Sequence, residues 1–143
     1  MVPFREAVDS IRTKLNAGTN LVCDRYAYSG VAFSCAKGMD TEWCKSCDKG
    51  LPAPDVIIYL DMPIETSSTR GKFGEERYEN IDFQKMVRLK FMELKQADDD
   101  KDKKMWQMVD ATRTVEEIQT DVRAIAEKTV EEVAGKEINM LWL

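Results

Sequence analysis

The fold of this chain is decided by the stretch Thr19-Asn-Leu-Val-Cys-Asp24-Arg25-Tyr26-Ala-Tyr-Ser29-Gly30. A short apolar run over 19–23 ends abruptly in Asp24 and Arg25. A buried parallel strand brings polar side chains to the carboxyl edge of its sheet in this way. Ligands of open α/β folds bind at that edge. The stretch therefore predicts a strand over 19–23 and a ligand site where the strand ends.

Helical and strand patterns alternate along the rest of the chain. Apolar residues recur at helical spacing in several segments, and Thr114 and Glu117 are spaced as a capping box for the last of them. The predicted helices cover 4–17, 26–37, 41–47, a short segment from Pro63 to about Arg70, 81–96, and the residues that follow Thr114. Apolar runs over 56–60 and 106–109 predict two more strands. Three strands separated by helices indicate a parallel, right-handed α/β arrangement.

The same patterns predict which residues are buried. The strand over 56–60 is apolar on both alternations, so both of its faces should be covered. Cys23 should be a small buried residue of the first strand. The charge run Asp98–Lys104 reads as a solvated connector. The inner face of the last helix is expected to carry Val115, Ile118, Val122, Ile125 and Thr129.

Length and composition indicate a single domain over 1–143. With 143 residues, 43% of them hydrophobic, the chain is long enough for one core and short for two. A net charge of −5 argues against nucleic-acid binding, which requires a basic face. The longest apolar run, Val56–Leu60, is far shorter than the roughly 20 residues of a membrane span, and no signal-peptide pattern opens the chain. We expect no nucleic-acid or membrane partner and a cytoplasmic or nuclear location.

Four cysteines leave three interpretations open. Cys44 and Cys47 have the spacing of a zinc or redox pair. Zinc usually takes four ligands, and because the chain contains no histidine, such a site would need Cys23 and Cys35 as well. The residues around the pair lack the context of a redox motif. The pattern favours incidental reduced thiols over a metal or redox site.

A second segment supplies the other half of the pattern. In Arg70-Gly-Lys-Phe-Gly-Glu75-Glu76-Arg77-Tyr78-Glu79, two arginines and three acids surround two glycines. Together the two segments resemble thymidylate kinases of the eukaryotic type, which phosphorylate dTMP with MgATP. The resemblance extends from about Pro3 to the closing Leu-Trp-Leu. It implies the α/β fold of P-loop nucleoside monophosphate kinases, a parallel sheet with flanking helices.

One part of that family's pattern does not occur in these residues. No Gly-x-x-x-x-Gly-Lys-Ser/Thr is present, although a phosphate-binding loop of this kind opens the family's fold. In the family, the strand before this loop lies between the strands that match 19–23 and 56–60. We therefore expect an incomplete sheet, with the N-terminal strands and the P-loop absent, in a fragment or truncated product. Such a chain is expected to be inactive and poorly folded alone.

The resemblance assigns roles to the strand-end residues. Asp24 would lie beside Mg²⁺ and the transferred phosphate, and Arg25 would bind the dTMP phosphate. Phosphoryl transfer depends on such positioning and charge neutralisation. In the alternative, both roles are structural: Asp24 caps the next helix, and Arg25 forms an ion pair with Asp24. Ser29, Gly30 and Phe33 would face thymine and deoxyribose, with Phe33 crowding a ribose 2′-hydroxyl; otherwise Phe33 is part of the core.

Residues 70–80 match the family's lid. By resemblance Arg70 stacks on the adenine of ATP, Glu76 and Arg77 lie by the phosphates, and Tyr78 approaches the dTMP sugar. The alternative is a solvated charged loop. Three further residues would form the adenine-side loop: Asp110, Ala111 and Thr112.

The implied function is a phosphotransferase that passes the γ-phosphate of ATP to dTMP, giving dTDP for dTTP biosynthesis. ATP is the co-substrate, used with Mg²⁺, and the full-length family implies a homodimer. Two alternatives stay open. The chain could be a truncated isoform that acts as a binding or dimerisation module, or it could belong to a kinase of another nucleoside monophosphate.

Overall fold

The computed structural model describes residues 4–64, residue 66 and residues 81–143. Its elements follow in the order α1 (Phe4–Asn16), α2 (Ala27–Ala36), α3 (Thr41–Ser46), β1 (Ile57–Asp61), α5 (Ile81–Asp99), β2 (Trp106–Asp110) and α6 (Val115–Val133). Helix separates strand from β1 onward, as the sequence predicts, whereas three helices in succession precede β1. Of the helix predicted from Pro63, only the first residues lie in the described part of the chain. The other predicted helices are confirmed to within a few residues at each end.

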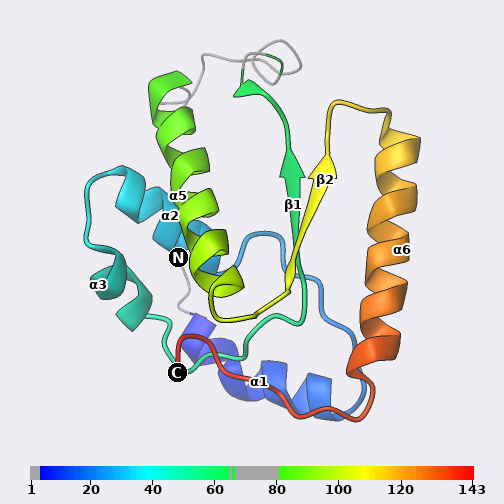
Figure 1. Ribbon diagram of the computed structural model, residues 1–143. Helices are drawn as coiled ribbons and strands as arrows, with labels where there is room; N and C mark the ends of the chain where they lie inside the picture. The colour runs from blue at the N-terminus through cyan, green and yellow to red at the C-terminus, as the bar shows by residue number, and fades with distance from the viewer. Residues whose placement is uncertain (1–3, 65, 67–80) are drawn as a thin grey trace.

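The sheet of the described residues contains two parallel strands. β1 and β2 pair in register from Ile57 opposite Trp106 to Asp61 opposite Asp110. Figure 1 shows α5 and α6 on opposite flanks of this pair, with α1 running beneath it. The parallel α/β arrangement is therefore confirmed. The prediction that β1 is covered on both of its faces is wrong, however, because the side chain of Leu60 is 54% exposed.

The helix ends follow from local sequence. Gly18 and Gly38 come after α1 and α2 with φ values of 80° and 91°, a backbone region that glycine adopts without steric cost. The side chain of Asp40 accepts a hydrogen bond of 2.8 Å from the backbone N–H of Trp43 and so caps α3. The predicted capping box of α6, formed by Thr114 and Glu117, is present.

The core lies where α2 packs against α5, α3 and the beginning of the sheet. α2 contributes most of it, because four of its ten residues are apolar and nearly inaccessible to solvent and a fifth is a buried tyrosine. The buried residues of this core are Ala27, Tyr28, Val31, Ala32, Cys35, Cys44, Leu51, Leu94, Trp106 and Leu141. Burial of such apolar area is the main favourable contribution to the stability of the fold.

Asp98 is a buried carboxylate inside this core, so the prediction that it belongs to a solvated connector is wrong. Its side chain is 4% exposed and accepts hydrogen bonds from the hydroxyl of Tyr28 at 2.8 Å and from Nε1 of Trp106 at 2.9 Å. The two donors offset the cost of removing the carboxylate from water. α5 continues three residues beyond its predicted end and thereby carries Asp98 between α2 and β2.

The C-terminal segment forms part of the core. Leu141 is 1% exposed, and its backbone N–H donates to the carbonyl of Leu51 at 2.8 Å. Pro52 and Met140 form an antiparallel bridge in the same place. The ring of Trp142 meets the ring of Tyr28 at 5.3 Å. The chain end is thus fastened to the loop that leads into β1.

Residues 19–23 do not form the predicted strand. The segment has no regular structure, Val22 is 98% exposed, and Cys23 is exposed rather than buried. A strand requires a neighbour for its backbone groups, and in the described part of the chain β1 pairs with β2 alone. The sequence signal for the strand is present, but the structure supplies no partner for it.

α6 packs more loosely than predicted. It lies beside β2, and none of its residues is fully buried. Ile118, Val122, Ile125 and Thr129 are half-buried, as expected for an inner face. Val115 is 74% exposed, so its assignment to that face is wrong. Val115 is exposed because it is the first residue of α6 and lies beyond the end of β2, where the sheet no longer covers the helix.

Candidate functional site

The two strands deliver a carboxylate each to the carboxyl edge of the sheet. Asp61 and Asp110 end β1 and β2 and are partners in the parallel register. Arg88 of α5 neutralises one of them, because its Nε and Nη2 donate to the two carboxylate oxygens of Asp61 at 2.9 and 2.8 Å. These hydrogen bonds lower the pKa of Asp61, so its carboxylate stays ionised at pH values well below 7. The edge is therefore polar and charged, as open α/β binding sites are.

The predicted adenine-side loop is a pre-formed turn. The carboxylate of Asp110 accepts from the backbone N–H of Thr112 at 2.8 Å and from its hydroxyl at 2.6 Å. These bonds lower the pKa of Asp110. Ala111 is buried between them, and its N–H donates to the carbonyl of Asp61 at 2.8 Å. The structure thus brings together the three residues that the sequence assigns to this loop.

Arg25 has an unusual backbone and a defined side-chain position. Its φ is 62°, a region that residues other than glycine rarely adopt, and such residues are enriched at functional sites. The guanidinium carbon lies 4.6 Å from the centre of the Phe33 ring. This distance is within the range of cation–π attraction. The exposed Arg25 is therefore held over Phe33, rather than paired with Asp24 as the alternative reading proposes.

The helix that follows Arg25 starts without a side-chain cap. α2 begins at Ala27 with Tyr26 as N-cap, the side chain of Tyr26 makes no capping hydrogen bond, and no acidic residue lies in the first turn. Asp24 is consequently not the cap of this helix. The helix dipole makes such an end favourable for an anion. Arg25 stands two residues before it.

The predicted sugar-side residues lie along α2. Ser29 and Gly30 are half-buried, and a Cβ built on Gly30 would meet no atom within 4 Å. The space beside Gly30 is open. Phe33 follows three residues later, is also half-buried, and meets the ring of Phe83 at 6.1 Å. The structure therefore places Phe33 beside Arg25 and outside the main core.

Asp24 is exposed and is the predicted magnesium-associated carboxylate. Within 4–64, 66 and 81–143 no group of three or more His, Cys, Asp or Glu side chains could hold a metal ion. Magnesium in nucleotide sites binds through one or two carboxylates together with substrate phosphates and water. A single carboxylate such as Asp24 fits this pattern, whereas a four-cysteine zinc site does not form. None of the four cysteines, all of them among the described residues, forms a disulfide.

Four predicted lid residues lie outside the described residues: Arg70, Glu76, Arg77 and Tyr78. Their roles stay predictions.

Within the described ranges, no helix combines the length and the apolar character that crossing a membrane requires.

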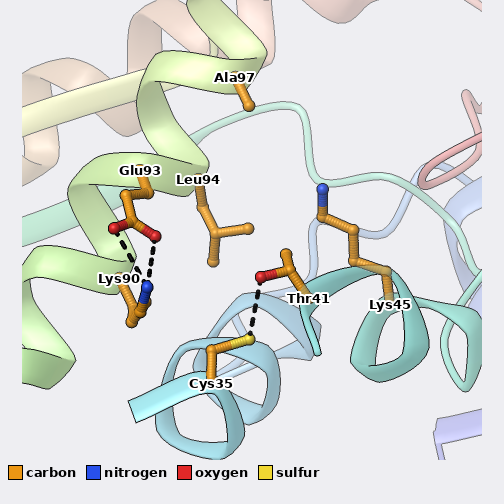
Figure 2. Close-up of a pocket in the computed structure, with 7 residues that line it drawn as sticks. All are labelled: Cys35, Thr41, Lys45, Lys90, Glu93, Leu94 and Ala97. Carbon is orange, nitrogen blue, oxygen red and sulfur yellow. Dashed lines mark hydrogen bonds and ion pairs between the residues drawn. The ribbon is translucent and has the colours of Figure 1, made fainter. Parts of the chain in front are cut away.

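Two hollows differ in what they can accommodate. A pocket of about 70 Å³ lies between α2, α3 and α5 (Figure 2), where the thiol of Cys35 donates to Thr41 and Lys90 pairs with Glu93. This pocket is far smaller than the roughly 300–1,000 Å³ of typical ligand sites. A wider hollow of about 490 Å³ opens beside Asp61 and Arg88 at the carboxyl edge of the sheet. Only the second has room for part of a nucleotide.

Comparison with known proteins explains this arrangement. The family model described as Thymidylate kinase matches residues 4–122, most of the chain. The chain belongs to the thymidylate kinase family. Thymidylate kinase of Dictyostelium discoideum is 48% identical over 120 residues, which cover 84% of this chain and 51% of that protein. The human thymidylate kinase is 40% identical over 139 residues, or 96% of this chain and 63% of that protein.

The fold agrees with the family. The solved thymidylate kinase of Candida albicans superimposes with a TM-score of 0.74 at 31% identity, covering 88% of this chain and 63% of that one. The fold expected from the resemblance, that of a nucleoside monophosphate kinase, is thus confirmed. This chain spans between about half and two thirds of the length of the relatives named here.

Sequence reasoning missed three residues of the site: Asp61, Arg88 and Phe83. Asp61 carries the same signal as Asp24, an acid directly after an apolar run, and could have been found from it. Arg88 and Phe83 lie within a helical pattern and carry no local signal. Only the packing of α5 shows their position.

Proposed function

We propose that this chain is part of an enzyme that transfers the γ-phosphate of ATP to dTMP and gives ADP and dTDP, a step that supplies dTTP. An oxygen of the dTMP phosphate forms a bond to the γ-phosphorus while the bond to the bridging β–γ oxygen breaks. Membership of the thymidylate kinase family supports the proposal. The observation that carries it is Arg25, held over Phe33 beside the uncapped start of α2.

This arrangement suits a nucleoside monophosphate. The planar guanidinium of Arg25 can bind phosphate oxygens through two parallel hydrogen bonds, which a lysine cannot. The positive end of the α2 dipole would favour the same anion. Beyond the phosphate, the open space beside Gly30 and the half-buried ring of Phe33 are proposed to accommodate the sugar. A 2′-hydroxyl would crowd Phe33, which favours a deoxyribose.

The other substrate, ATP, would bind toward the carboxyl ends of β1 and β2. The turn at Asp110, Ala111 and Thr112 is proposed as the adenine-side loop. Mg²⁺ bound with ATP would neutralise phosphate charge, with Asp24 as the carboxylate beside it. Arg70, Glu76, Arg77 and Tyr78 complete the proposed site from the lid, and a homodimer is proposed as the assembled form.

The test uses the native-length protein, meaning the form expressed from its complete gene. Arg25→Ala should raise the KM for dTMP much more than the KM for ATP. A lost charge-assisted, bidentate contact costs about 1.5–3 kcal/mol, roughly ten- to hundredfold in affinity. If both KM values and kcat stay at wild-type levels, Arg25 is not the phosphate ligand and this proposal fails.

A second candidate function is a kinase of another nucleoside monophosphate. The solved structure of the Candida albicans relative is described as revealing the origin of broad substrate specificity in that enzyme. Comparing dTMP, dUMP and UMP as substrates separates the two. Phe33→Ala should raise the use of UMP relative to dUMP if Phe33 excludes the 2′-hydroxyl. Unchanged discrimination would assign Phe33 a packing role only.

A further inference from the structure

Three side chains from two helices lie in series at the site. Phe83, in the first turn of α5, meets the ring of Phe33 on α2 at a centroid distance of 6.1 Å and an interplanar angle of 65°. Phe33 in turn carries the guanidinium of Arg25, whose central carbon lies 4.6 Å from its ring centre. We call Phe83, Phe33 and Arg25 the arginine stack.

The two rings of the stack lie outside the main core. Both are half-buried, and neither belongs to the core cluster that the described residues form. Other aromatic residues of the same helices differ in this respect. Tyr28 of α2 is part of that cluster, and Phe91 of α5 packs against it and meets Tyr59 at 5.2 Å. The stack is therefore a separate contact between α2 and α5, placed beside Arg25.

The stack restrains a side chain that would otherwise be mobile. An exposed arginine has many rotamers and loses them on binding a ligand, so a side chain already held in place binds more tightly. The face of an aromatic ring attracts a guanidinium, but only if the ring presents its face. An edge-to-face partner fixes how a ring is turned. Phe83 supplies that partner to Phe33.

We propose that Phe83 is a positioning residue for Arg25: its ring sets the orientation of Phe33, and Phe33 holds the guanidinium where it meets the phosphate of the nucleoside monophosphate. Only the contact between the guanidinium and the phosphate rests on the proposed function. The stack itself is independent of any substrate. In this proposal Phe83 acts on Arg25 through its ring contact with Phe33.

A matched pair of variants on one helix tests the proposal in the native-length protein. Phe83→Leu removes the ring that faces Phe33, whereas Phe91→Leu removes the ring that faces Tyr59. Phe83→Leu should raise the KM for dTMP about three- to tenfold and leave the KM for ATP unchanged. Phe91→Leu should lower thermal stability at least as much without this selective change. Phe83→Tyr, which keeps the ring, should restore the wild-type KM for dTMP.

A nucleotide-free measurement separates this inference from the proposed function. The Nε–H proton of Arg25 should resonate upfield in NMR spectra because it lies over the Phe33 ring, and Phe33→Leu should abolish that shift. Phe83→Leu, or Phe83→Met if the leucine variant does not fold, should move the signal toward its position in Phe33→Leu. A signal that stays at its wild-type position overturns the inference. So does a KM for dTMP that changes equally in Phe83→Leu and Phe91→Leu. Failure of Arg25→Ala to affect dTMP would instead overturn the proposed function.

Discussion

The hydroxyl of Tyr28 donates a hydrogen bond of 2.8 Å to the carboxylate of Asp98, 70 residues further along the chain. The same carboxylate oxygen accepts from Nε1 of Trp106 at 2.9 Å, and the rings of Tyr28 and Trp106 meet at 5.3 Å. One buried acid thus joins α2, the end of α5 and the start of β2. These three elements carry the candidate site.

Asp98→Ala should lower the free energy of unfolding by about 3 kcal/mol. The substitution removes the acceptor of two buried donors, and each unsatisfied donor costs about 1–3 kcal/mol. Asp100→Ala is the matched control, because Asp100 belongs to the same charge run, is exposed, and its carboxylate accepts a hydrogen bond from the side chain of Gln96 at the surface. It should change stability by less than about 0.5 kcal/mol. Urea unfolding of both variants measures the difference, and equal values would contradict a buried role for Asp98.

The sequence could not predict this role for Asp98. In a run that contains Asp98, Asp99, Asp100 and Asp102, each acid carries the same local signal, and such runs are usually solvated. What distinguishes Asp98 is its place at the end of α5 opposite two aromatic donors. That information lies in tertiary packing. The capping box at Thr114 was predictable because both of its partners lie within four residues.

Leu141→Ala should destabilise the protein by about 2–5 kcal/mol. Leu141 is 1% exposed, and a truncated buried leucine loses both its transfer energy and its packing contacts. Leu143→Ala is the control, since Leu143 is 76% exposed and its loss should cost less than about 0.5 kcal/mol. Thermal unfolding of the pair measures the effect. A small effect of Leu141→Ala would mean that the C-terminal segment is not part of the cooperative core.

The stretch 19–30 shows both the strength and the limit of the sequence. It correctly predicts α2, because an apolar run that ends before Gly38 is a local signal, whereas the ligand site at Asp24 and Arg25 stays a prediction. It wrongly predicts a strand over 19–23 and a buried Cys23. A strand depends on the backbone of a neighbour, and no periodicity shows whether that neighbour is present.

Asp61→Asn should remove a pH-dependent part of the stability. Arg88 lowers the pKa of Asp61 below its ordinary value of 3.8. A depressed pKa means that the folded protein binds a proton less readily than the unfolded chain. The stabilisation is therefore present above pH 3.8 and is lost as the pH falls through the lower, folded value. Because the pair is partly exposed, its contribution at neutral pH should be only about 0.5–1 kcal/mol.

The free energy of unfolding of wild type and Asp61→Asn, measured at several pH values between 7 and 2, tests this direction. The two values should differ at neutral pH and converge in acid. Lys128→Gln is a control, because it breaks an exposed pair with Glu132 on α6. Its curve should follow the wild type throughout. Curves of Asp61→Asn that run parallel to the wild type would show that the Arg88 contact is not retained in solution.

Residues 1–143 expressed by themselves should not form dTDP from dTMP and MgATP. They contain no Gly-x-x-x-x-Gly-Lys-Ser/Thr, and in this chemistry such a loop holds the β- and γ-phosphates and stabilises the transition state. The measurement is product formation by the purified chain, with the native-length protein as reference. Turnover within the roughly 1–100 per second of ordinary kinases would show that other groups replace the loop.

Gly30→Ala should separate stability from function in the native-length protein. Gly30 lies inside α2, where glycine is less favourable than alanine by about 0.5–1 kcal/mol. A Cβ at this position meets no atom within 4 Å, so the substitution fits the free protein and should raise its free energy of unfolding by that amount. If the open space belongs to the dTMP sugar, the same methyl group obstructs the substrate. The KM for dTMP should then rise about tenfold.

Thr120→Ala controls for the gain in helix stability. Thr120 is an exposed residue of α6 whose hydroxyl bonds back to the carbonyl of Glu116, and alanine has the higher helix propensity. Thr120→Ala should stabilise the protein slightly and leave the KM for dTMP unchanged. If the Gly30→Ala variant is more stable than the wild type and has the same KM for dTMP, Gly30 lies outside the nucleotide site. A more stable but impaired Gly30→Ala, beside an unimpaired Thr120→Ala, would assign the open face of α2 to the substrate, because the added methyl group has no other contact to disturb.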